Sequence, residues 1–461
     1  MRVRVYFQST DFSSIFVVKQ FTIITMIPKI LEKLKIDALN EMQLASLEAS
    51  EKEGDLILFS PTGSGKTLGF LLPVLKKLDP SIKGIQALIL VPSRELALQI
   101  EQVFKQMGTG LKVNCCYGGH SIKTECDNLS EAPAVLVGTP GRITYHLRSN
   151  NFDTDPIQTL VLDEFDKALE FGFQEDMSFI ISQLKNLSKR ILTSATKMDQ
   201  IPSFTGVDEY IELDFLSDTP TKLKGLNQKY VVAEGTDKLE TLFKLICKLK
   251  NRTTLVFCNH RDAVERISEI LWNMELAHGI FHGGMEQKDR EKALIKFRNG
   301  SHRILITTDL ASRGLDIPEI EFVVHYQLPL TEDAYIHRNG RTARMNARGT
   351  SYLILAEADK LPKFIKEKPA KEMLPNESVI PENSPWVTLY FAAGKKDKIN
   401  KVDIVGFLMQ KGKLTKEELG LIEVLDNSSY AAVLRIRVNA LLLNLKHEKM
   451  KNRKIKMAVS E

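Results

Sequence analysis

The stretch GDLILFSPTGSGKT, residues 54–67, decides the fold of this chain. An apolar run enters a turn rich in glycine and serine, and the turn ends in Lys66 and Thr67. A buried strand that continues through such a turn into a helix offers backbone N–H groups to phosphate, a lysine to the terminal phosphates and a hydroxyl to Mg²⁺. Ser60 stands where glycine is usual, so the match depends on the end of the turn and on the strand and helix around it. The alternative is a surface turn that binds no ligand, and such a turn would not need a buried strand before it and a helix after it. The expected phosphate-binding residues are Thr62, Gly63, Ser64, Gly65, Lys66 and Thr67.

Length and charge bound the organisation of the chain. With 461 residues, of which 43% are hydrophobic and 26% charged, it has the composition of a globular protein of about three domains. Residues 385–461 hold 15 lysine and arginine residues against 8 aspartate and glutamate residues, whereas the rest of the chain holds 48 against 50. A basic module on a near-neutral body indicates an anionic partner, and a merely solvated basic surface is the alternative.

Cysteine usage and hydropathy indicate the compartment. The five cysteines show no CxxC or Cys/His ligand spacing, which predicts reduced thiols in a cytosolic protein rather than a zinc site or a disulfide framework. No run of about 18 apolar residues occurs, and Lys19 interrupts the apolar run near the N-terminus. We therefore expect a cytoplasmic protein. Residues 1–25 form an N-terminal extension, and because the amphipathic pattern begins at Met26, translation from Met26 is an alternative start.

After the glycine-rich turn, β-rich runs alternate with helical patterns, which predicts a parallel sheet with helices on both faces. The expected strands are Ala87–Val91 before PSRELALQ, Ala134–Val137 before GTPGR, Thr159–Leu162 before DEFD and Arg190–Leu192 before TSAT. In such sheets the ligand lies beyond the carboxyl ends of the strands, where each of these polar clusters falls. Upstream, helical spacing over 27–34 and 44–47 surrounds Gln43, whose amide can pair with adenine; an exposed helical glutamine is the alternative.

The DEFD cluster is expected to perform the hydrolytic chemistry. Asp163 follows a buried run and can hold Mg²⁺ together with Thr67, and Glu164 beside it can orient the attacking water. A helix N-cap with acids favoured by the dipole is the alternative, and it does not account for the phosphate loop upstream.

A second α/β domain is predicted after a linker. Its expected strands are Thr254–Phe257, Ile304–Ile306, Glu321–Val324 and Ser351–Leu355. It has no phosphate loop, but it contains TTDLASRGLD at 307–316 and HRNGRTAR at 337–344. Arginines supplied by such a domain to a triphosphate on the first domain accelerate phosphoryl transfer by about 10³ to 10⁵; exposed surface charge is the alternative.

The last part of the chain reads as a βαββαβ module after a linker rich in lysine, proline and glutamate, the split arrangement of RRM-like folds. The strand expected at 430–436 has Tyr430 as its one aromatic residue, so base stacking of the usual RRM kind is not predicted. Lys395, Lys396 and Lys398 offer phosphate contacts instead, and docking to a protein is the alternative for this module.

Over residues 35–355 the motifs and their order resemble those of DEAD-box RNA helicases. SPTGSGKT, PSRELA, the pair Gly118–Gly119, TPGR, DEFD, SAT, VFCN, HGGMEQKDR, TDLASRGLD and HRNGRTAR follow one another as in that family. The resemblance implies two RecA-like domains that close on ATP, Mg²⁺ and single-stranded RNA. The C-terminal module, especially GKKDKINKVDIVGFL, resembles the RNA-binding domain of the DbpA group, which implies large-subunit ribosomal RNA or pre-ribosomal particles as partner.

The resemblance also assigns residue roles. It implies adenine reading by Gln43, ribose contact by Asp316, metal binding by Thr67 and Asp163, hydrolysis through Lys66 and Glu164, and arginine fingers at Arg341 and Arg344. Ser194 and Thr196 would couple hydrolysis to strand separation by bonding Asp166, with His337 in the same coupling set. The residues implied to grip RNA are Arg94, Gly119, Thr139, Gly141, Arg142, Arg290, Thr308 and Arg313.

The prediction is thus an α/β chain of two tandem RecA-like parallel-sheet domains and a C-terminal α+β RRM-like domain. Its expected parts are the extension 1–25, domain 1 over 26–214, a linker 215–228, domain 2 over 229–358, a linker 359–384 and the module 385–461. Phe165 replaces the alanine usual in the family, and because the acids are kept we expect ATPase and local unwinding activity with repacking beneath the site. A non-catalytic RNA clamp or annealing chaperone is the alternative; a transporter ATPase is disfavoured because no LSGGQ-like segment or membrane span occurs.

Overall fold

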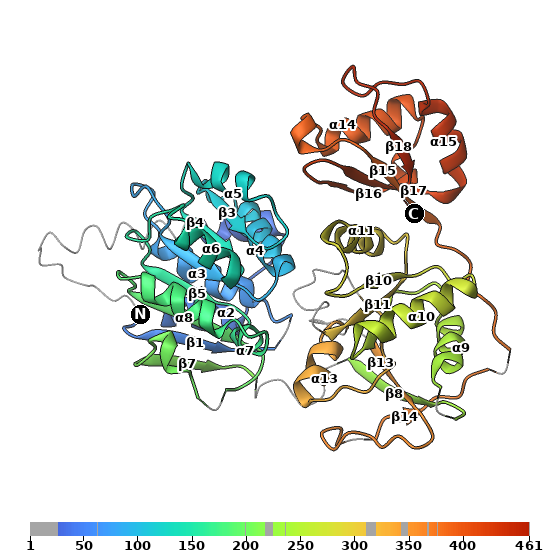
Figure 1. The fold of residues 1–461 in the computed structure, drawn as a ribbon, viewed down its shortest axis with the longest axis horizontal. Helices are drawn as coiled ribbons and strands as arrows, with labels where there is room; N and C mark the ends of the chain where they lie inside the picture. The colour runs from blue at the N-terminus through green and yellow to red at the C-terminus, as the bar shows by residue number, and fades with distance from the viewer. Residues whose placement is uncertain are drawn as a thin grey trace, which may run out of the picture. The chain divides into compact units, whose positions relative to one another are not determined.

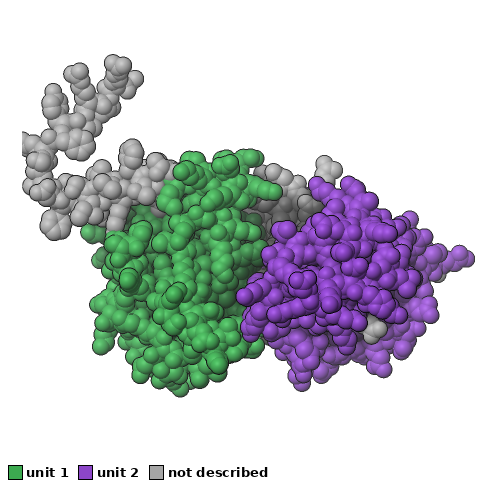
Figure 2. Space-filling model, turned by 90° about the horizontal axis from the view of Figure 1, so that it is seen from above, with its two compact units in different colours: residues 1–221, 314–316 green, residues 222–313, 317–461 purple. Residues whose placement is uncertain are grey.

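A computed structural model describes residues 26–461 except 62, 199, 217–224, 236, 310–319, 343–348, 367, 376 and 461. The chain divides into two compact units, residues 1–221 with 314–316 and residues 222–313 with 317–461 (Figure 2). The expectations for residues 1–25, Thr62, Arg313, Asp316 and Arg344 lie outside the described residues. No helix in the described part of the chain is both long enough and apolar enough to cross a bilayer.

Unit 1 is built on a parallel sheet of seven strands in the order β3-β4-β2-β5-β6-β1-β7 (Figure 1). The strands are β1 Asp55–Phe59, β2 Ala87–Leu90, β3 Val113–Cys116, β4 Val135–Gly138, β5 Thr159–Leu162, β6 Lys189–Ser194 and β7 Tyr210–Asp214. The central strands are apolar and fully buried because helices cover both faces of a parallel sheet. The expected central strands are confirmed.

Alternate residues of these strands enter two separate cores. Leu56, Ile89 and Val161 pack with helices α3 and α4, whereas Ile57 and Leu162 pack against the helices of the opposite face. The helices are α2 Glu41–Ala49, α3 Lys66–Lys77, α4 Arg94–Met107, α5 Ile122–Leu129, α6 Pro140–Arg148, α7 Phe165–Glu170 and α8 Gln174–Gln183, and residues 26–34 are also helical. This two-sided covering brings every strand-to-helix turn to the edge formed by the carboxyl ends of the strands.

Unit 2 begins with a second parallel sheet of seven strands in the order β10-β11-β9-β12-β13-β8-β14. Its strands are β8 Leu226–Val232, β9 Thr254–Cys258, β10 Gly279–Phe281, β11 Ile304–Thr308, β12 Phe322–His325, β13 Gly349–Leu355 and β14 Ala370–Lys371. Its described helices are α9 Leu239–Leu249, α10 Arg261–Asn273, α11 Gln287–Arg298 and α13 Glu332–Asn339. Val256, Ile306 and Val324 form a core with α9 and α10, as the apolar runs predicted.

Both predicted linkers contain strand residues. β8 begins at Leu226, within the range 215–228, and β14 lies within the range 359–384 and pairs with β8 in parallel. Glu372 follows β14, donates its N–H to the Tyr230 carbonyl at 2.8 Å, and its carboxylate accepts hydrogen bonds from Lys229 and Lys248. The second linker is therefore partly a strand at the edge of the sheet.

The C-terminal module has the predicted βαββαβ order and an antiparallel sheet arranged β16-β17-β15-β18. Its elements are β15 Trp386–Phe391, α14 Lys401–Gly406, β16 Leu419–Val424, β17 Ser429–Leu434, α15 Val438–Leu445 and β18 Met457–Val459. Val387, Leu389 and Phe391 enter the module's core with helices α14 and α15. Because side chains alternate along a strand, Thr388 and Tyr390 lie on the opposite face of the sheet.

That opposite face contacts the turn after α11 within unit 2. Thr388 is 1% exposed, and its hydroxyl is 2.8 Å from Asn299 Nδ2 and 2.7 Å from Ser301 Oγ. Arg298 forms an ion pair with Glu423 of β16 at 3.7 Å. The sheet face on which RRM domains commonly stack bases is therefore partly covered by the chain itself.

Candidate nucleotide and nucleic-acid sites

The glycine-rich turn between β1 and α3 has the form that a phosphate needs. Gly63 and Gly65 have φ values of +85° and +88°, and Gly65 is the N-cap of α3. The φ of Gly65 disfavours any side chain there, and a Cβ would lie 2.6 Å from Gln43 Nε2 and displace that amide. Ser60 Oγ donates to Ser64 Oγ at 2.6 Å, which gives the unusual serine at the start of the loop a structural role.

Lys66 begins α3 and points its charge into a buried position. Its Nζ is buried and has no hydrogen-bond partner among the residues that the structure describes. An unpaired buried ammonium is costly unless an anion approaches it, and the N–H groups of the first helical turn beside it favour the same charge. The chemistry of these residues fits a triphosphate.

Gln43 lies against the phosphate loop. Its side chain and that of Asn40 form a capping box at the start of α2, and Gln43 Nε2 donates to the Gly65 carbonyl at 3.1 Å. Asn40 Nδ2 also donates to the Ser64 carbonyl at 2.8 Å. The glutamine predicted to read adenine is thus buried and tied to the turn that would hold the phosphates, a contact that sequence spacing did not predict.

Asp163 directly follows β5 and is 4% exposed. Its Oδ1 accepts hydrogen bonds from the Thr193 hydroxyl and, at 3.0 Å, from the Glu164 N–H. Burial raises the pKa of Asp163, and the charge of Lys66 and these hydrogen bonds oppose that effect. A buried carboxylate close to a lysine and a helix N-terminus is a donor that suits a Mg²⁺ ion bound with phosphate.

Glu164 holds a strained backbone conformation. Its φ and ψ are 49° and 47°, in the left-handed region, where it caps α7, and the residue is 8% exposed. Non-glycine residues adopt this conformation at a cost of about 1 to 3 kcal/mol, and they cluster at functional sites. Glu164 stands at the N-cap position of α7, but its carboxylate accepts no capping hydrogen bond from that helix, so the helix-cap alternative is not favoured.

The predicted link between DEFD and SAT is present through one of its two members. Thr196 Oγ1 donates to Asp166 Oδ2 at 3.0 Å. Ser194 Oγ donates instead to the Thr196 carbonyl at 2.6 Å and accepts from the Thr196 N–H at 3.0 Å. Ser194 therefore shapes the turn after β6, whereas the sequence predicted that it would bond Asp166 directly.

Phe165 is accommodated in the core below the acids. It is 1% exposed and packs with Phe204 at a ring-centroid distance of 6.2 Å, in the same core as Leu162 and Met177. The Phe165 ring is thus a buried part of this apolar core, and the repacking expected from the substitution stays a prediction.

Residues predicted to grip RNA lie at the ends of three neighbouring strands, β3, β4 and β2. Gly119 has a φ of +82°, Thr139 is the N-cap of α6, and Arg94 begins α4 with its guanidinium 4.5 Å from the centre of the Tyr117 ring. Arg142 and Gly141 lie in the first turn of α6. The fold therefore gathers these residues at one edge of unit 1.

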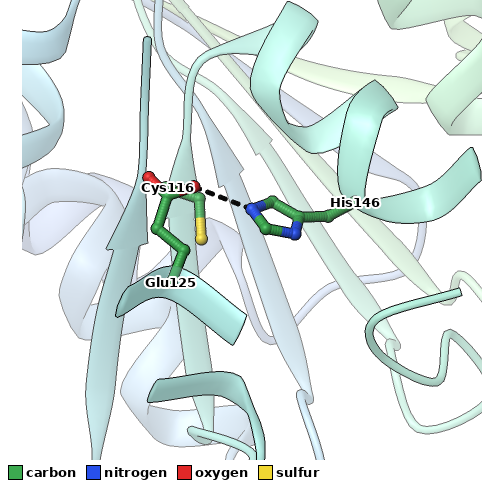
Figure 3. Close-up of side chains that lie close together, drawn as sticks. All are labelled: Cys116, Glu125 and His146. Atoms are coloured by element: carbon green, nitrogen blue, oxygen red, sulfur yellow. Dashed lines mark hydrogen bonds and ion pairs between the residues drawn. The ribbon is translucent and has the colours of Figure 1, made fainter. Parts of the chain in front are cut away.

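Glu125, which the sequence did not single out, lies behind that edge. Its carboxylate is fully buried and faces His146 and Cys116 (Figure 3). Glu125 Oε2 is 2.8 Å from His146 Nε2 and 2.9 Å from Arg142 Nη1. An acidic residue on a helix of mixed composition has the sequence pattern of a surface residue, so no signal in the sequence identified it.

In unit 2, Arg338 is at the centre of a network of hydrogen bonds. It donates to both oxygens of Asp309, to the Gln327 carbonyl at 2.7 Å and to Asn259 Oδ1 at 2.7 Å, with its guanidinium 5.2 Å from the centre of the Phe257 ring. It thereby joins three of the predicted motif segments, HRNGRTAR, TDLASRGLD and VFCN. The sequence had pointed to its neighbours in HRNGRTAR instead.

Unit 2 also contains other residues that the sequence predicted for coupling, hydrolysis or RNA binding. His337 and Arg341 are 4% and 3% exposed. Thr308 ends β11, and Arg290 lies with its guanidinium 4.9 Å from the centre of the ring of Phe281, on the adjacent strand β10.

The lysines predicted for the module form one basic turn. Lys395, Lys396 and Lys398 are exposed on the turn between β15 and α14. Lys451 Nζ donates to the Lys398 carbonyl at 2.7 Å and pairs with Asp403 at 2.7 Å, which brings a second basic segment beside this turn.

Comparison with known proteins identifies the segments. Residues 40–202 match the DEAD/DEAH box helicase family, 237–346 the helicase conserved C-terminal domain and 388–459 the DbpA RNA binding domain. The chain is 37% identical over 313 residues to the ATP-dependent RNA helicase eIF4A of Mycosarcoma maydis, covering 67% of this chain and 76% of the relative. It is 28% identical to the ATP-dependent RNA helicase DbpA of Bacillus subtilis over 95% of this chain and 98% of the relative.

Solved structures of DEAD-box proteins are similar to this chain as well. S. cerevisiae Dbp5 bound to RNA and ADP BeF3 matches with a TM-score of 0.66 and 25% identity, over 75% of this chain and 93% of that chain. Mss116p bound to ssRNA and AMP-PNP matches with a TM-score of 0.66 and 26% identity, over 76% and 77%. The phosphate loop, the buried acids, the two RecA-like sheets and these matches together show that the chain belongs to the DEAD-box family of ATP-dependent RNA helicases, with a C-terminal DbpA RNA-binding domain.

Proposed function

We propose that this helicase is an RNA-stimulated ATPase that separates short RNA duplexes locally, and that its module directs it to ribosomal RNA of the large subunit. The observation that carries the proposal is the meeting of three sets of residues at adjacent strands: the phosphate loop after β1, the acids after β5 and the SAT turn after β6. The sheet order β5-β6-β1 supports this proposal, because it brings these three turns to one edge of the sheet.

In the proposed reaction, Lys66 and the N-terminus of α3 bind the triphosphate, and Gln43 selects adenine. Thr67 and Asp163 would hold Mg²⁺, which neutralises phosphate charge when bound. Glu164, held by its strained backbone, orients the attacking water. Asp316 contacts the ribose. Arg341 and Arg344 of the second RecA-like domain complete the charge stabilisation, as arginine fingers do in phosphoryl transfer.

The coupling to RNA follows from the same edge of each domain. Thr196 transmits a change at Asp166 to the turn after β6. Backbone-gripping residues on both domains then hold one strand without reading its sequence, and the 2′-hydroxyl separates RNA from DNA. The proposed gripping residues are Arg94, Gly119, Thr139, Gly141, Arg142, Arg290, Thr308 and Arg313, and His337 belongs to the coupling set.

The C-terminal module is proposed to select the RNA on which the helicase acts. Its sheet face is partly covered by the turn after α11, whereas Lys395, Lys396 and Lys398 are exposed, so phosphate contacts at the basic turn are favoured over base stacking on the sheet. The relative named DbpA, similar over nearly the whole chain, supports this choice. Five free cysteines favour the reducing cytoplasm as the compartment of this activity.

The Glu164→Gln variant tests the hydrolytic assignment. It keeps the size of the side chain and removes the carboxylate, so ATP turnover should fall by at least about 100-fold while ATP and RNA binding remain. The matched control is Glu175→Gln, an exposed position on α8, which should turn over ATP as the wild type does. Full hydrolysis in Glu164→Gln would contradict the assignment.

The alternative, a non-catalytic clamp or annealing chaperone, is motivated by Phe165. Steady-state hydrolysis without RNA, with a generic oligonucleotide and with large-subunit ribosomal RNA separates the two. Stimulation by ribosomal RNA above the oligonucleotide, lost on deletion of residues 385–461, supports the targeted helicase. Nucleotide binding without turnover under all three conditions supports the clamp.

A further inference from the structure

One buried carboxylate joins several of the elements that carry the proposed RNA contacts of unit 1. Glu125 lies on α5, and its side chain is 0% exposed. Its Oε1 accepts from the Tyr117 N–H at 3.0 Å and lies 3.3 Å from His120 Nδ1. Its Oε2 lies 2.9 Å from Arg142 Nη1 and 2.8 Å from His146 Nε2. All four groups that contact the carboxylate can donate a hydrogen bond to it.

These donors come from two neighbouring strand ends. Tyr117 and His120 flank the Gly118–Gly119 turn after β3, and Arg142 and His146 belong to α6 after β4. Arg142 Nη2 also donates to the His120 carbonyl at 3.3 Å, so the guanidinium bridges the turn and the carboxylate. The conformation of the turn and the direction of Arg142 are therefore fixed by the same group.

The charge of Glu125 is kept in spite of its burial. Burial alone would raise its pKa, but hydrogen bonds from His120, His146 and the Tyr117 N–H, together with the charge of Arg142, outweigh that effect and hold the pKa at about 2. The carboxylate is thus anionic at neutral pH. Hydrogen bonds to a buried charged acceptor are shorter and stronger than neutral ones and hold their donors in place.

A metal site at the same cluster is disfavoured by the same contacts. Cys116, Glu125 and His146 offer ligand atoms within 4.8 Å of one another. Both Glu125 oxygens are already engaged, the positive guanidinium of Arg142 lies beside them, and burial raises the pKa of the Cys116 thiol far above its usual range. The cluster is built as an anchor for donors and not as a cation site.

We propose that Glu125 is a positioning residue for RNA, which sets the Gly118–Gly119 turn and Arg142 against the phosphodiester backbone without contacting RNA itself. The proposal rests on the proposed role of this edge in binding RNA. It assigns to unit 1 a residue that affects RNA affinity separately from the ATP site, because Glu125 contacts the RNA edge and, among the residues that the structure describes, none of the phosphate loop.

The Glu125→Gln variant removes the charge at nearly constant shape. Its amide NH₂ group must face either Arg142 and His146 or the Tyr117 N–H, so at least one donor loses its acceptor. The KM for single-stranded RNA in the ATPase assay, and the Kd of a fluorescent oligonucleotide by anisotropy, should each rise about tenfold. The KM for ATP and the kcat at saturating RNA should stay within about twofold of the wild-type values, a split that general destabilisation would not produce.

Three further variants make the test specific. Asp127→Asn removes an exposed negative charge from the same helix and should leave RNA binding unchanged. Glu125→Asp keeps the charge on a shorter side chain and should give an intermediate KM for RNA; it also carries the test if Glu125→Gln does not fold. The double variant Glu125→Gln/Arg142→Ala should bind RNA more weakly than the wild type by a factor smaller than the product of the two single-variant factors.

The outcomes separate this inference from the proposed function. Wild-type RNA affinity in both Glu125 variants, a parallel rise in the KM values for ATP and RNA, or full additivity with Arg142→Ala would overturn the positioning role. Absence of ATP turnover in the wild-type protein would overturn the proposed function, and the anisotropy measurement would still test Glu125.

Discussion

At the scale of single residues, Asp163 shows how a position proposed to bind metal opposes folding. Its folded-state pKa lies above the ordinary aspartate value of 3.8, with burial as the main cause. The folded state therefore binds a proton more readily than the unfolded state does. At pH values above the folded-state pKa, ionised Asp163 lowers the stability of unit 1. Lys66 and two hydrogen bonds to Oδ1 reduce the penalty, and a bound cation would reduce it further.

Asparagine at this position should stabilise the fold and stop catalysis. Asp163→Asn keeps Oδ1 as the acceptor for Thr193 and Glu164 and removes the buried charge, so we expect the nucleotide-free protein at pH 7 to gain about 1 kcal/mol in unfolding free energy. ATP hydrolysis should fall at least about 100-fold. Urea unfolding followed by fluorescence, with the exposed Asp208→Asn as control, measures the first effect; a lower stability than wild type would contradict it.

Sequence patterns predicted the chemistry of the nucleotide site and less of its support. Thr196 was expected to bond Asp166, and it does. Glu125 and Arg338 were missed because a charged residue that is buried among donors or acceptors has the same local pattern as one that faces water. Their partners come from elsewhere in the chain, Arg142 being 17 residues from Glu125 and Asp309 being 29 residues from Arg338.

At the scale of elements, the sequence predicted the inner strands except β8 and missed the sheet edges. β3, β7, β10 and β14 are the outer strands of the two parallel sheets, and none was expected. β7 has the sequence YIELD with mostly part-exposed residues, whereas β2, β4 and β5 are fully buried. A strand covered on both faces needs a continuous apolar run, and an edge strand does not, so its signal is weaker.

The edge strand β14 gives a pH-dependent prediction. Hydrogen bonds from Lys229 and then Lys248 lower the pKa of Glu372. Its contribution to stability is therefore present above the ordinary glutamate pKa of 4.5 and is lost as the pH falls through the lower folded-state value. At pH 7, Glu372→Gln should weaken the attachment of β14 to β8 by about 1 kcal/mol.

Native-state hydrogen exchange measures this attachment. Amides of β8 and β14 should exchange about fivefold faster in Glu372→Gln than in wild type at pH 7, and the difference should shrink at pH 3. Glu377→Gln, at an exposed position in the same linker, is the control. Equal exchange in the two proteins at pH 7 would show that the ion pairs do not hold this edge.

At the scale of the whole molecule, the order of two RecA-like domains and an RRM-like module was predictable, but the contact within unit 2 was not. Asn299, Ser301 and Thr388 meet in a buried polar contact between the turn after α11 and β15. Each of these residue types is usual on a surface, so the sequence gives no reason to expect them buried. Burial also raises the pKa of Tyr430 on the same face, and the charges of Glu291 and Asp289 of α11 add to that rise.

Removing the Thr388 hydroxyl should loosen the module. Thr388→Val keeps the shape of the side chain and leaves Asn299 and Ser301 without this partner, at a cost of about 1 to 3 kcal/mol. Cleavage after Glu382 by a glutamate-specific protease should become several-fold faster, while the module itself stays folded. Thr388→Ser retains the hydroxyl and should be cleaved nearly as slowly as wild type. An unchanged rate in Thr388→Val would mean that this contact does not restrain the module.

The contact at Thr388 also limits how freely such proteins can recombine. A C-terminal binding module is often regarded as a cassette that gene fusion can move from one enzyme to another. Here the module depends on a matching patch on the second RecA-like domain. Asn299, Ser301 and Arg298 of that patch contact Thr388 and Glu423 of the module. A chimera that receives the module without this patch would gain a tethered binding domain, and it would lose the contacts of Thr388 and Glu423 with the turn after α11.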